Sequence, residues 1–354
     1  MPDKTDKGGD KGKVAGAKTV ASQVLLNLVY VSVWIALSGT VILYNKWILA
    51  YYGFPYPIAL TMWHMFFSST LATICVRGGY VPSANMTTDV YMRAIVPIGA
   101  LFAGTLWLGN AAYLYLSVSF IQMLKALMPV AVFIVGCGLG TENYSLPTLS
   151  NMIVVTIGVG IASYGEINFV VVGVFLQLLS VMAESTRLTL VQILLQRRGL
   201  TLNPITTMYY IAPASLAFLA IPFALIEARQ IFYDPAVRFD IPIFVSNAAA
   251  AFGLNMSVFL LIGKTSALTM NIAGVVKDWM LIALSILLFG SKVSPINLGG
   301  YLIAFFGVCF YNFQKLQAMK AKQQAQMLAA AAQKAREEDD EKGLLLGKLR
   351  ANDS

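Results

Sequence analysis

Two charged residues, Lys277 and Asp278, stand side by side in the apolar run 268–289. A run of this length and composition predicts a helix that spans a membrane. Placing a charge at the centre of a bilayer costs on the order of 3 kcal/mol, so such residues usually face a substrate or a partner on another helix. Neighbours on a helix point about 100° apart, so we expect the two charges not to neutralise each other. The alternative is a structural lysine whose partner lies on a neighbouring helix.

A second lysine, Lys125, lies deep in another apolar run. It precedes Pro129 by four residues, and because proline has no N–H, the carbonyl of Lys125 lacks its helical partner. A kinked helix with a cation beside the kink is a candidate anion site. Lys46 lies near the end of the first apolar run, where it can equally be an anchor that extends to the membrane interface. Deep lysines predict an anionic substrate, and phosphate suits the point charge of an ammonium group.

Other polar residues inside apolar runs complete the candidate site. Asparagines there can hydrogen-bond between helices or bind a sugar hydroxyl; they are Asn110, Asn255 and Asn271. Glu184 and Arg187 are three residues apart on a predicted helix, so they can form an ion pair along one face. A structural role and a gating role for this pair both stay open. His64, the only histidine, lies among aromatic residues, and we expect it to be hydrogen-bonded in the core.

The composition is that of a polytopic membrane protein. The chain has 354 residues, of which 58% are hydrophobic and only 12% charged, about half the charged fraction of soluble domains. Its three cysteines lack CxxC spacing, so neither a disulfide framework nor a zinc site is expected. Phosphate-binding loops and hydrolase motifs are missing, and we predict a protein that is not an enzyme, with no catalytic residues, metal or cofactor. The net charge of +8 lies partly in tails and loops, so we expect no nucleic-acid partner.

Apolar runs long enough to span a bilayer predict about ten transmembrane helices. They are 24–49, 56–76, 91–115, 119–139, 147–164, 170–196, 204–226, 241–262, 268–289 and 294–313. An even number of spans puts both termini on one side, and Lys and Arg are concentrated on that side. The opposite side holds only Arg229, Arg238 and Lys292, so the positive-inside rule predicts cytosolic termini. We expect a disordered N-terminal tail, 1–23, and a polar C-terminal tail, 314–354.

Two segments of the chain resemble each other. Residues 116–129 and 264–277 both begin with a short link that contains Ser or Thr, followed by a helix with one deep lysine. Each repeat contains an odd number of spans, about five. Its second copy therefore enters the membrane inverted, as in transporters that bind substrate between their halves. We therefore predict an all-α polytopic fold of two inverted repeats of about five helices each, 24–165 and 166–313, and alternating access.

The order and spacing of several motifs resemble those of a known family. The motifs are YNKW at 44–47, FPYP at 54–57, VPIG at 96–99, SFIQMLKALMPV at 119–130, ASYGE at 162–166, LNPI at 202–205 and GKTSALTMNIAGVVKDW at 263–279. On these residues the chain is similar to the triose-phosphate/nucleotide-sugar transporter group of the drug/metabolite transporter superfamily, over residues 24–320. The resemblance is greatest to Golgi carriers of UDP-arabinofuranose. It implies inverted helical halves and an antiport mechanism.

The resemblance also bears on the substrate. In the plastid triose-phosphate branch, phosphate is held by a lysine matching Lys125 and by a Lys-Arg pair matching Lys277 and Asp278. Here an aspartate replaces the arginine, and Gln122 replaces a histidine three residues before the first lysine. These departures fit a substrate with hydroxyl groups, so the resemblance implies exchange of a nucleotide sugar for a nucleoside monophosphate across the Golgi membrane. A sugar-phosphate or phosphoenolpyruvate/phosphate translocator remains the alternative.

These arguments define a set of expected site residues and partners. The substrate-binding residues are expected to be Lys125, Lys277, Asp278, Lys46, Asn110, Asn255, Asn271 and Gln122, with Glu184 and Arg187 as a gating or structural pair. The lipid bilayer is the further expected partner, and a homodimer is left open. The identity of the sugar and of the nucleotide is left open as well.

Overall fold

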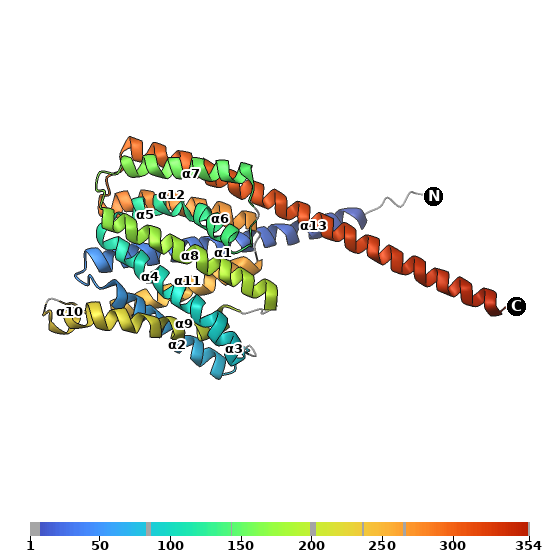
Figure 1. Cartoon of the computed structure of the whole chain (residues 1–354), viewed down its shortest axis with the longest axis horizontal. Coiled ribbons are helices and arrows are strands. Elements are labelled where there is room, and N and C mark those ends of the chain that lie inside the picture. The colour runs from blue at the N-terminus through green and yellow to red at the C-terminus, as the bar shows by residue number, and fades with distance from the viewer. Residues whose placement is uncertain are drawn as a thin grey trace, which may run out of the picture. The chain divides into compact units, whose positions relative to one another are not determined.

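The computed structural model describes residues 8–82, 86–142, 144–198, 203–235, 237–264 and 267–352. Within these ranges the regular structure is entirely helical, so the predicted all-α fold is confirmed (Figure 1). Eight helical stretches among the described residues, some made of two or three successive helices, are long and apolar enough to cross a membrane, and a shorter apolar helix covers Ile241–Ser257.

The helices follow the predicted apolar runs in chain order. They are α1 (Gly8–Ala50), α2 (Pro57–Arg77), α3 (Thr88–Val90), the π-helical turn η1 (Tyr91–Ile95), α4 (Val96–Tyr115), α5 (Val118–Lys125), α6 (Met128–Gly138), α7 (Leu146–Tyr164), α8 (Val171–Arg198), α9 (Pro204–Pro222), the π-helical turn η2 (Phe223–Glu227), α10 (Ala228–Tyr233), α11 (Ile241–Lys264), α12 (Ala267–Phe289) and α13 (Pro295–Asn352). α1 begins inside the segment 1–23, for which we expected disorder. The division into two inverted repeats stays a prediction. We call the end of the bundle at which α1 stops the Ala50 end.

The kink that Pro129 predicts is in fact a complete break between two helices. α5 ends at Lys125, and α6 begins at Met128 with Pro129 in its first turn. Between the two helices, the N–H groups of Ala126 and Leu127 donate to carbonyls three residues earlier, both at 3.1 Å. Because proline cannot donate to the carbonyl four residues before it, the predicted single span becomes two stacked helices.

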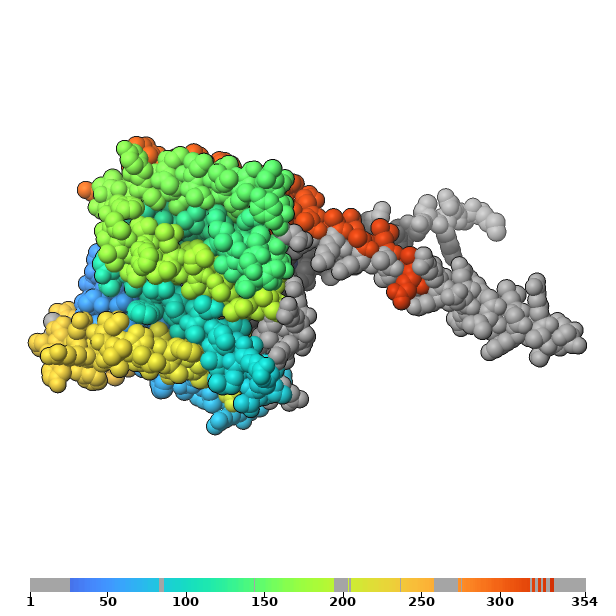
Figure 2. Space-filling view, viewed as in Figure 1, coloured from blue at the N-terminus to red at the C-terminus, as the bar shows by residue number. Residues whose placement is uncertain are grey.

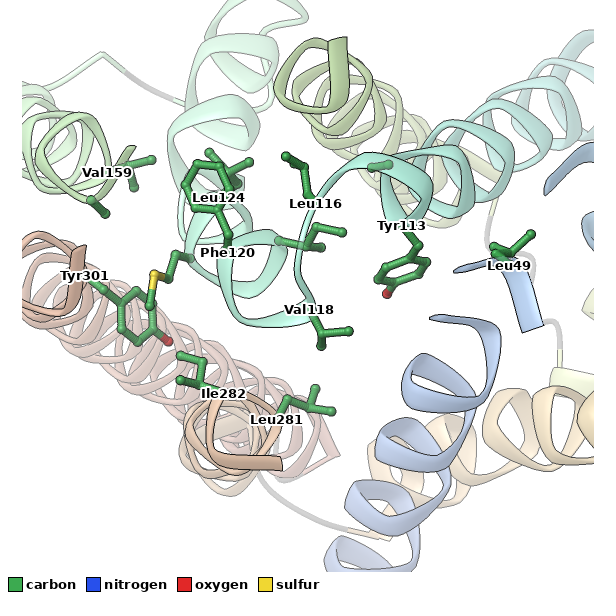
Figure 3. Packing of buried hydrophobic residues seen from close by; sticks show 14 of the residues in the cluster. Leu49, Tyr113, Leu116, Val118, Phe120, Leu124, Val159, Leu281, Ile282 and Tyr301 are labelled. Atoms are coloured by element: carbon green, nitrogen blue, oxygen red, sulfur yellow. The ribbon is translucent and has the colours of Figure 1, made fainter. Parts of the chain in front are cut away.

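The largest buried cluster fixes α5 against α12 (Figure 3). Phe120 of α5 is fully buried there, together with Leu281 and Ile282 of α12. Because lipid tails are as apolar as these side chains, close packing rather than removal from water holds such helices together. The cluster therefore sets the distance between the two helices that carry Lys125 and Lys277.

α7 and the first turns of α13 pack backbone to backbone. A Cβ atom on Gly300 would lie 2.2 Å from the amide nitrogen of Ala162, and one on Gly158 would lie 2.4 Å from that of Ala304. Small residues permit this approach between membrane helices. The chain forms two units, Met1–Val308 and Cys309–Ser354, and the candidate site lies in the first. Figure 2 shows the face of that unit to which α7, α8 and the α9–α10 segment contribute.

Candidate functional site

Lys277 and Asp278 form an ion pair in the middle of α12. The Lys277 Nζ lies 3.3 Å from an Asp278 carboxylate oxygen and 5.5 Å from the centre of the Trp34 ring on α1. The expectation that these neighbours would not neutralise each other is therefore wrong, because the long lysine side chain bends across the angle between them. The two side chains are 17% and 31% exposed, so both remain accessible to a ligand.

Lys125 ends α5 and joins this pair in one charged cluster. It is half-buried, and it lies within electrostatic range of Lys277, Asp278 and Glu184. Among the residues that the structure describes, Lys125 has no ion-pair or hydrogen-bond partner. The structure thus brings the two deep lysines together and leaves one of them unpaired within the described part of the chain.

Lys125 lies inside the candidate membrane span Val118–Gly138, and Lys277 lies inside α12, which coincides with the apolar run 268–289. At about 1.5 Å per residue, Lys277 is about 18 Å from the end of α12 at Phe289, and Lys125 is about 10 Å from the start of α5 at Val118. The hydrocarbon core of a bilayer is about 30 Å thick. Ionised groups at this depth are costly and mark substrate or ion pathways.

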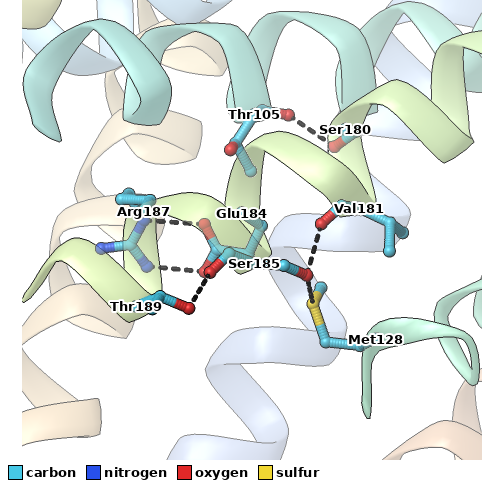
Figure 4. A network of polar contacts seen from close by, with 8 residues as sticks. All are labelled: Thr105, Met128, Ser180, Val181, Glu184, Ser185, Arg187 and Thr189. Carbon is cyan, nitrogen blue, oxygen red and sulfur yellow. Dashed lines mark hydrogen bonds and ion pairs between the residues drawn. The ribbon is translucent and has the colours of Figure 1, made fainter. Parts of the chain in front are cut away.

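Glu184 and Arg187 form the predicted ion pair along α8. Two N–H groups of the guanidinium donate to the two carboxylate oxygens at 2.7 and 2.6 Å (Figure 4), and the guanidinium lies 5.2 Å from the centre of the Phe102 ring on α4. Nearby, Ser180 donates to the carbonyl of Thr105 at 2.8 Å and ties α8 to α4. A bidentate pair fixes both side chains, which favours the structural role over the gating role.

The cluster as a whole is positive. Three cations, Lys125, Lys277 and Arg187, stand against two carboxylates, Asp278 and Glu184, so three minus two leaves a net charge of +1 when all are ionised. Because the other four groups form two ion pairs, the excess charge is that of Lys125. An anion is the ligand that balances it, and the cluster supplies ammonium donors and a carboxylate acceptor to hold one.

Lys46 is bound to the protein's own backbone. It is buried, and its Nζ donates to the carbonyls of Tyr113 at 2.7 Å and Leu116 at 3.0 Å. Carbonyls at the C-terminal end of a helix, here α4, lack helical partners, and a cation also complements the helix dipole there. Lys46 therefore caps α4, and we leave it out of the proposed substrate site.

Asn110 belongs to a chain of buried hydrogen bonds that crosses α1, α2, α4 and α11. Its members, in order of donation, are His64, Asn247, Asn45, Asn110 and Thr61. The last three bonds are 2.9, 3.1 and 3.0 Å long. The direction is fixed because Asn247 accepts from His64 with its oxygen and donates to Asn45 with its nitrogen. The prediction of a hydrogen-bonded core histidine is thus confirmed, and both polar atoms of Asn110 are already occupied.

The other predicted amides differ in their surroundings. Asn255 is half-buried and donates within α11 to the carbonyl of Ala251 at 3.1 Å. The side chain of Asn271 lies outside the described residues. Gln122 lies one turn before Lys125 and is 1% exposed, and neither of its amide atoms has a partner in the described part of the chain. Because an unpaired buried amide is costly, Gln122 is the predicted amide best suited to meet a ligand.

Side-chain hydrogen bonds join the α1–α2 loop to the α10–α11 loop at the Ala50 end. Tyr52 donates to Asp240 at 2.6 Å, and Tyr56 donates to Asp234 at 3.2 Å. The bond to Asp240 raises the pKa of Tyr52, whereas burial first, and then the bond to Asp234, raises the pKa of Tyr56. Glu227 accepts from two backbone N–H groups in the first turn of α2, at 2.9 and 2.8 Å. These bonds hold this end together between elements far apart in sequence.

Sequence reasoning missed several of these residues, among them Trp34, Glu227 and Asn247. Trp34 carries no local signal, because its ring meets Lys277 only through the packing of α1 against α12. Glu227 does carry one. A carboxylate at the end of an apolar run needs a partner, and the N-terminus of a neighbouring helix is a suitable one.

Comparison with known proteins also indicates a transporter. The model of the Triose-phosphate Transporter family matches residues 25–312. One probable sugar phosphate/phosphate translocator of Arabidopsis thaliana is 51% identical over 337 residues, which cover 94% of this chain and 95% of the relative. Another is 53% identical over 306 residues, which cover 86% and 87%. A GDP-mannose transporter of the same plant is 29% identical over 285 residues, which cover 79% and 83%.

Proposed function

The chain belongs to the triose-phosphate transporter family and is a multi-pass membrane transporter, and we propose that it exchanges a sugar phosphate for inorganic phosphate. The nucleotide-sugar interpretation of the sequence takes second place. Relatives named as sugar phosphate/phosphate translocators are 51% and 53% identical to this chain, against 29% for the relative named as a GDP-mannose transporter. Identity of that degree over most of the chain supports the smaller substrate.

One observation carries the proposal: Lys125 adds an unbalanced positive charge beside the Lys277–Asp278 pair, deep in the membrane-spanning part. In the proposed complex, the phosphate group accepts hydrogen bonds from Lys125 and Lys277, and the unpaired amide of Gln122 donates a further one. Asp278 accepts from a hydroxyl group of the sugar. Charge-assisted bonds of this kind are about twice as strong as neutral ones.

A nucleotide sugar remains the second candidate because of Asp278. A carboxylate in place of a second cation lowers the attraction for a small dianion, and it provides an acceptor for the hydroxyl groups of a sugar. Inorganic phosphate has no sugar hydroxyl to use that acceptor. The Golgi membrane, the cytosolic termini and the homodimer stay predictions.

Counter-exchange in proteoliposomes tests the proposal. We expect vesicles preloaded with phosphate to take up labelled sugar phosphate, and vesicles without internal phosphate to take up much less. Lys125→Ala and Lys277→Ala should abolish this uptake, whereas Lys292→Ala, which changes an exposed loop lysine, should not. Exchange of a UDP-sugar for UMP without any phosphate exchange would reject the sugar-phosphate proposal in favour of the second candidate.

A further inference from the structure

An apolar cavity of about 430 Å³ lies near the Ala50 end, between α2, the α9–α10 segment and the start of α11. Its lining consists only of apolar and aromatic residues. They are Phe54, Ala59, Met62, Trp63, Phe66, Leu216, Phe223, Ile231, Val237, Phe239 and Phe244. None of them belongs to the charged cluster, so the cavity needs an explanation that is independent of the transported substrate.

The cavity offers nothing to a polar ligand. The indole N–H of Trp63 is the one polar side-chain group in the lining, and it already donates to the carbonyl of Phe244 at 2.8 Å. A phosphorylated molecule would bury its charge unpaired here, and buried water needs two or more polar partners. Leaving a cavity empty destabilises a protein in proportion to the volume. Hydrocarbon is therefore the chemistry that fits.

The cavity also lies at the depth of bilayer hydrocarbon. Its α2 residues run from Ala59 to Phe66, about 3 to 14 Å from the first residue of the helix, and the hydrocarbon of one leaflet is about 15 Å thick. α2 and the α9–α10 segment both belong to candidate membrane spans. Phe66 and Phe239 are 53% and 51% exposed, so part of the lining faces the surroundings, which at this depth are lipid.

A cation, Arg238, lies between two lining residues in the chain. Arg238 is exposed, and both of its neighbours in the chain, Val237 and Phe239, belong to the lining. It follows the last residue of the α9–α10 span, Tyr233, where a lipid headgroup would begin. A guanidinium binds a phosphate through two parallel hydrogen bonds. We propose that the cavity holds one acyl chain of a membrane phospholipid whose phosphate is bound by Arg238.

Fluorescence quenching by brominated acyl chains tests the site, because Trp63 is part of its wall. Subtracting the fluorescence emission of Trp63→Phe from that of the wild type, both in nanodiscs of phosphatidylcholine, gives the emission of Trp63. We expect brominated phosphatidylcholine to quench most of this component. Filling the cavity from either wall, by Ala59→Phe or Leu216→Phe, should remove the quenching. Ala224→Phe, the same change at an exposed position outside the lining, should preserve it.

Native mass spectrometry of the purified protein gives a second readout. A retained phospholipid should be absent from the two filled variants, and Arg238→Gln should lower its occupancy by about fivefold. Equal quenching in the filled variants and in Ala224→Phe would mean that Trp63 meets only the lipid surrounding the protein, which overturns the proposal. Retention of a sterol in place of a phospholipid would overturn it as well.

Discussion

Replacing Lys125 by methionine tests the charge argument most directly, because it removes the excess cation and keeps a side chain of similar length. The lost charge-assisted hydrogen bond to phosphate is worth about 1.5–3 kcal/mol. Coulomb attraction at about 4 Å amounts to about 4 kcal/mol per pair of unit charges at an effective dielectric constant of about 20. The cost of removing water from both ions offsets part of these two contributions. We therefore expect Lys125→Met to weaken phosphate binding by about 2–4 kcal/mol. Phosphate affinity should then fall by about 30- to 1,000-fold.

The stability of the protein should respond differently. Because Lys125 has no partner to lose among the described residues, Lys125→Met should leave the thermal unfolding temperature unchanged or raise it. A charge at this depth is itself costly, and methionine removes that cost. The expected pattern is thus a large loss of phosphate affinity with no loss of stability.

Two measurements on the same purified protein check this pattern. Counter-exchange in proteoliposomes gives the KM for phosphate, and thermal unfolding in detergent gives the stability. Lys292→Met serves as the control, since it makes the same change at an exposed loop position and should alter neither quantity. Wild-type phosphate affinity in Lys125→Met would refute the argument. A loss of affinity that merely parallels a loss of stability would make Lys125 a structural residue.

Three further predictions concern other charged groups. Lys46→Met should lower the free energy of unfolding by about 3–6 kcal/mol, because it removes two charge-assisted bonds. An increased KM with unchanged denaturant stability would place Lys46 in the substrate site instead. Asp278→Asn should raise phosphate exchange relative to sugar-phosphate exchange, and equal scaling of both rates in a substrate panel would contradict that role. Burial raises the pKa of the Glu166 carboxyl above its usual 4.5, so ionisation of this carboxyl opposes folding. The free energy of unfolding should therefore fall as pH rises from about 4.5 through the raised pKa. Glu166→Gln, which keeps an acceptor for Asn297, should remove this fall in unfolding measured against pH; an unchanged pH dependence would show that Glu166 does not cause it.

The sequence predicts the helices and a distortion before Pro129 in the fourth span, because both depend on local properties. An apolar run needs no partner in order to form a membrane helix, and the missing N–H of Pro129 breaks the ladder wherever the residue stands. The ion pair of Glu184 and Arg187 was predictable for the same reason, since both residues lie on one helix at a fixed spacing. These predictions depend only on neighbours in the chain.

Properties that depend on packing between distant helices were missed or left open. Lys46 caps α4 only because α1 passes the end of that helix, and its position in the chain gives no hint of this. The positions of Lys277 and Asp278 on a helical wheel argued against an ion pair between them. The wheel describes only the directions of the Cβ atoms and ignores the length of a lysine side chain. Asn110 joined a network of side chains from three other helices, which no local pattern reveals.

The charge of the cluster has a last consequence, for the form in which phosphate crosses. To change sides, the site must pass through a state closed to water, where unbalanced charge is expensive, on the order of 3 kcal/mol per charge. The empty cluster carries +1, a complex with singly charged phosphate is neutral, and a complex with doubly charged phosphate carries −1. The rate of exchange should therefore be about 100-fold higher than the rate of uptake into vesicles without internal substrate. It should also speed up as pH falls toward about 6, where phosphate esters gain a proton. Initial rates of sugar-phosphate exchange at equal pH on both sides measure this, and a rate that rises with pH would show that the cluster does not carry the charge we assign to it.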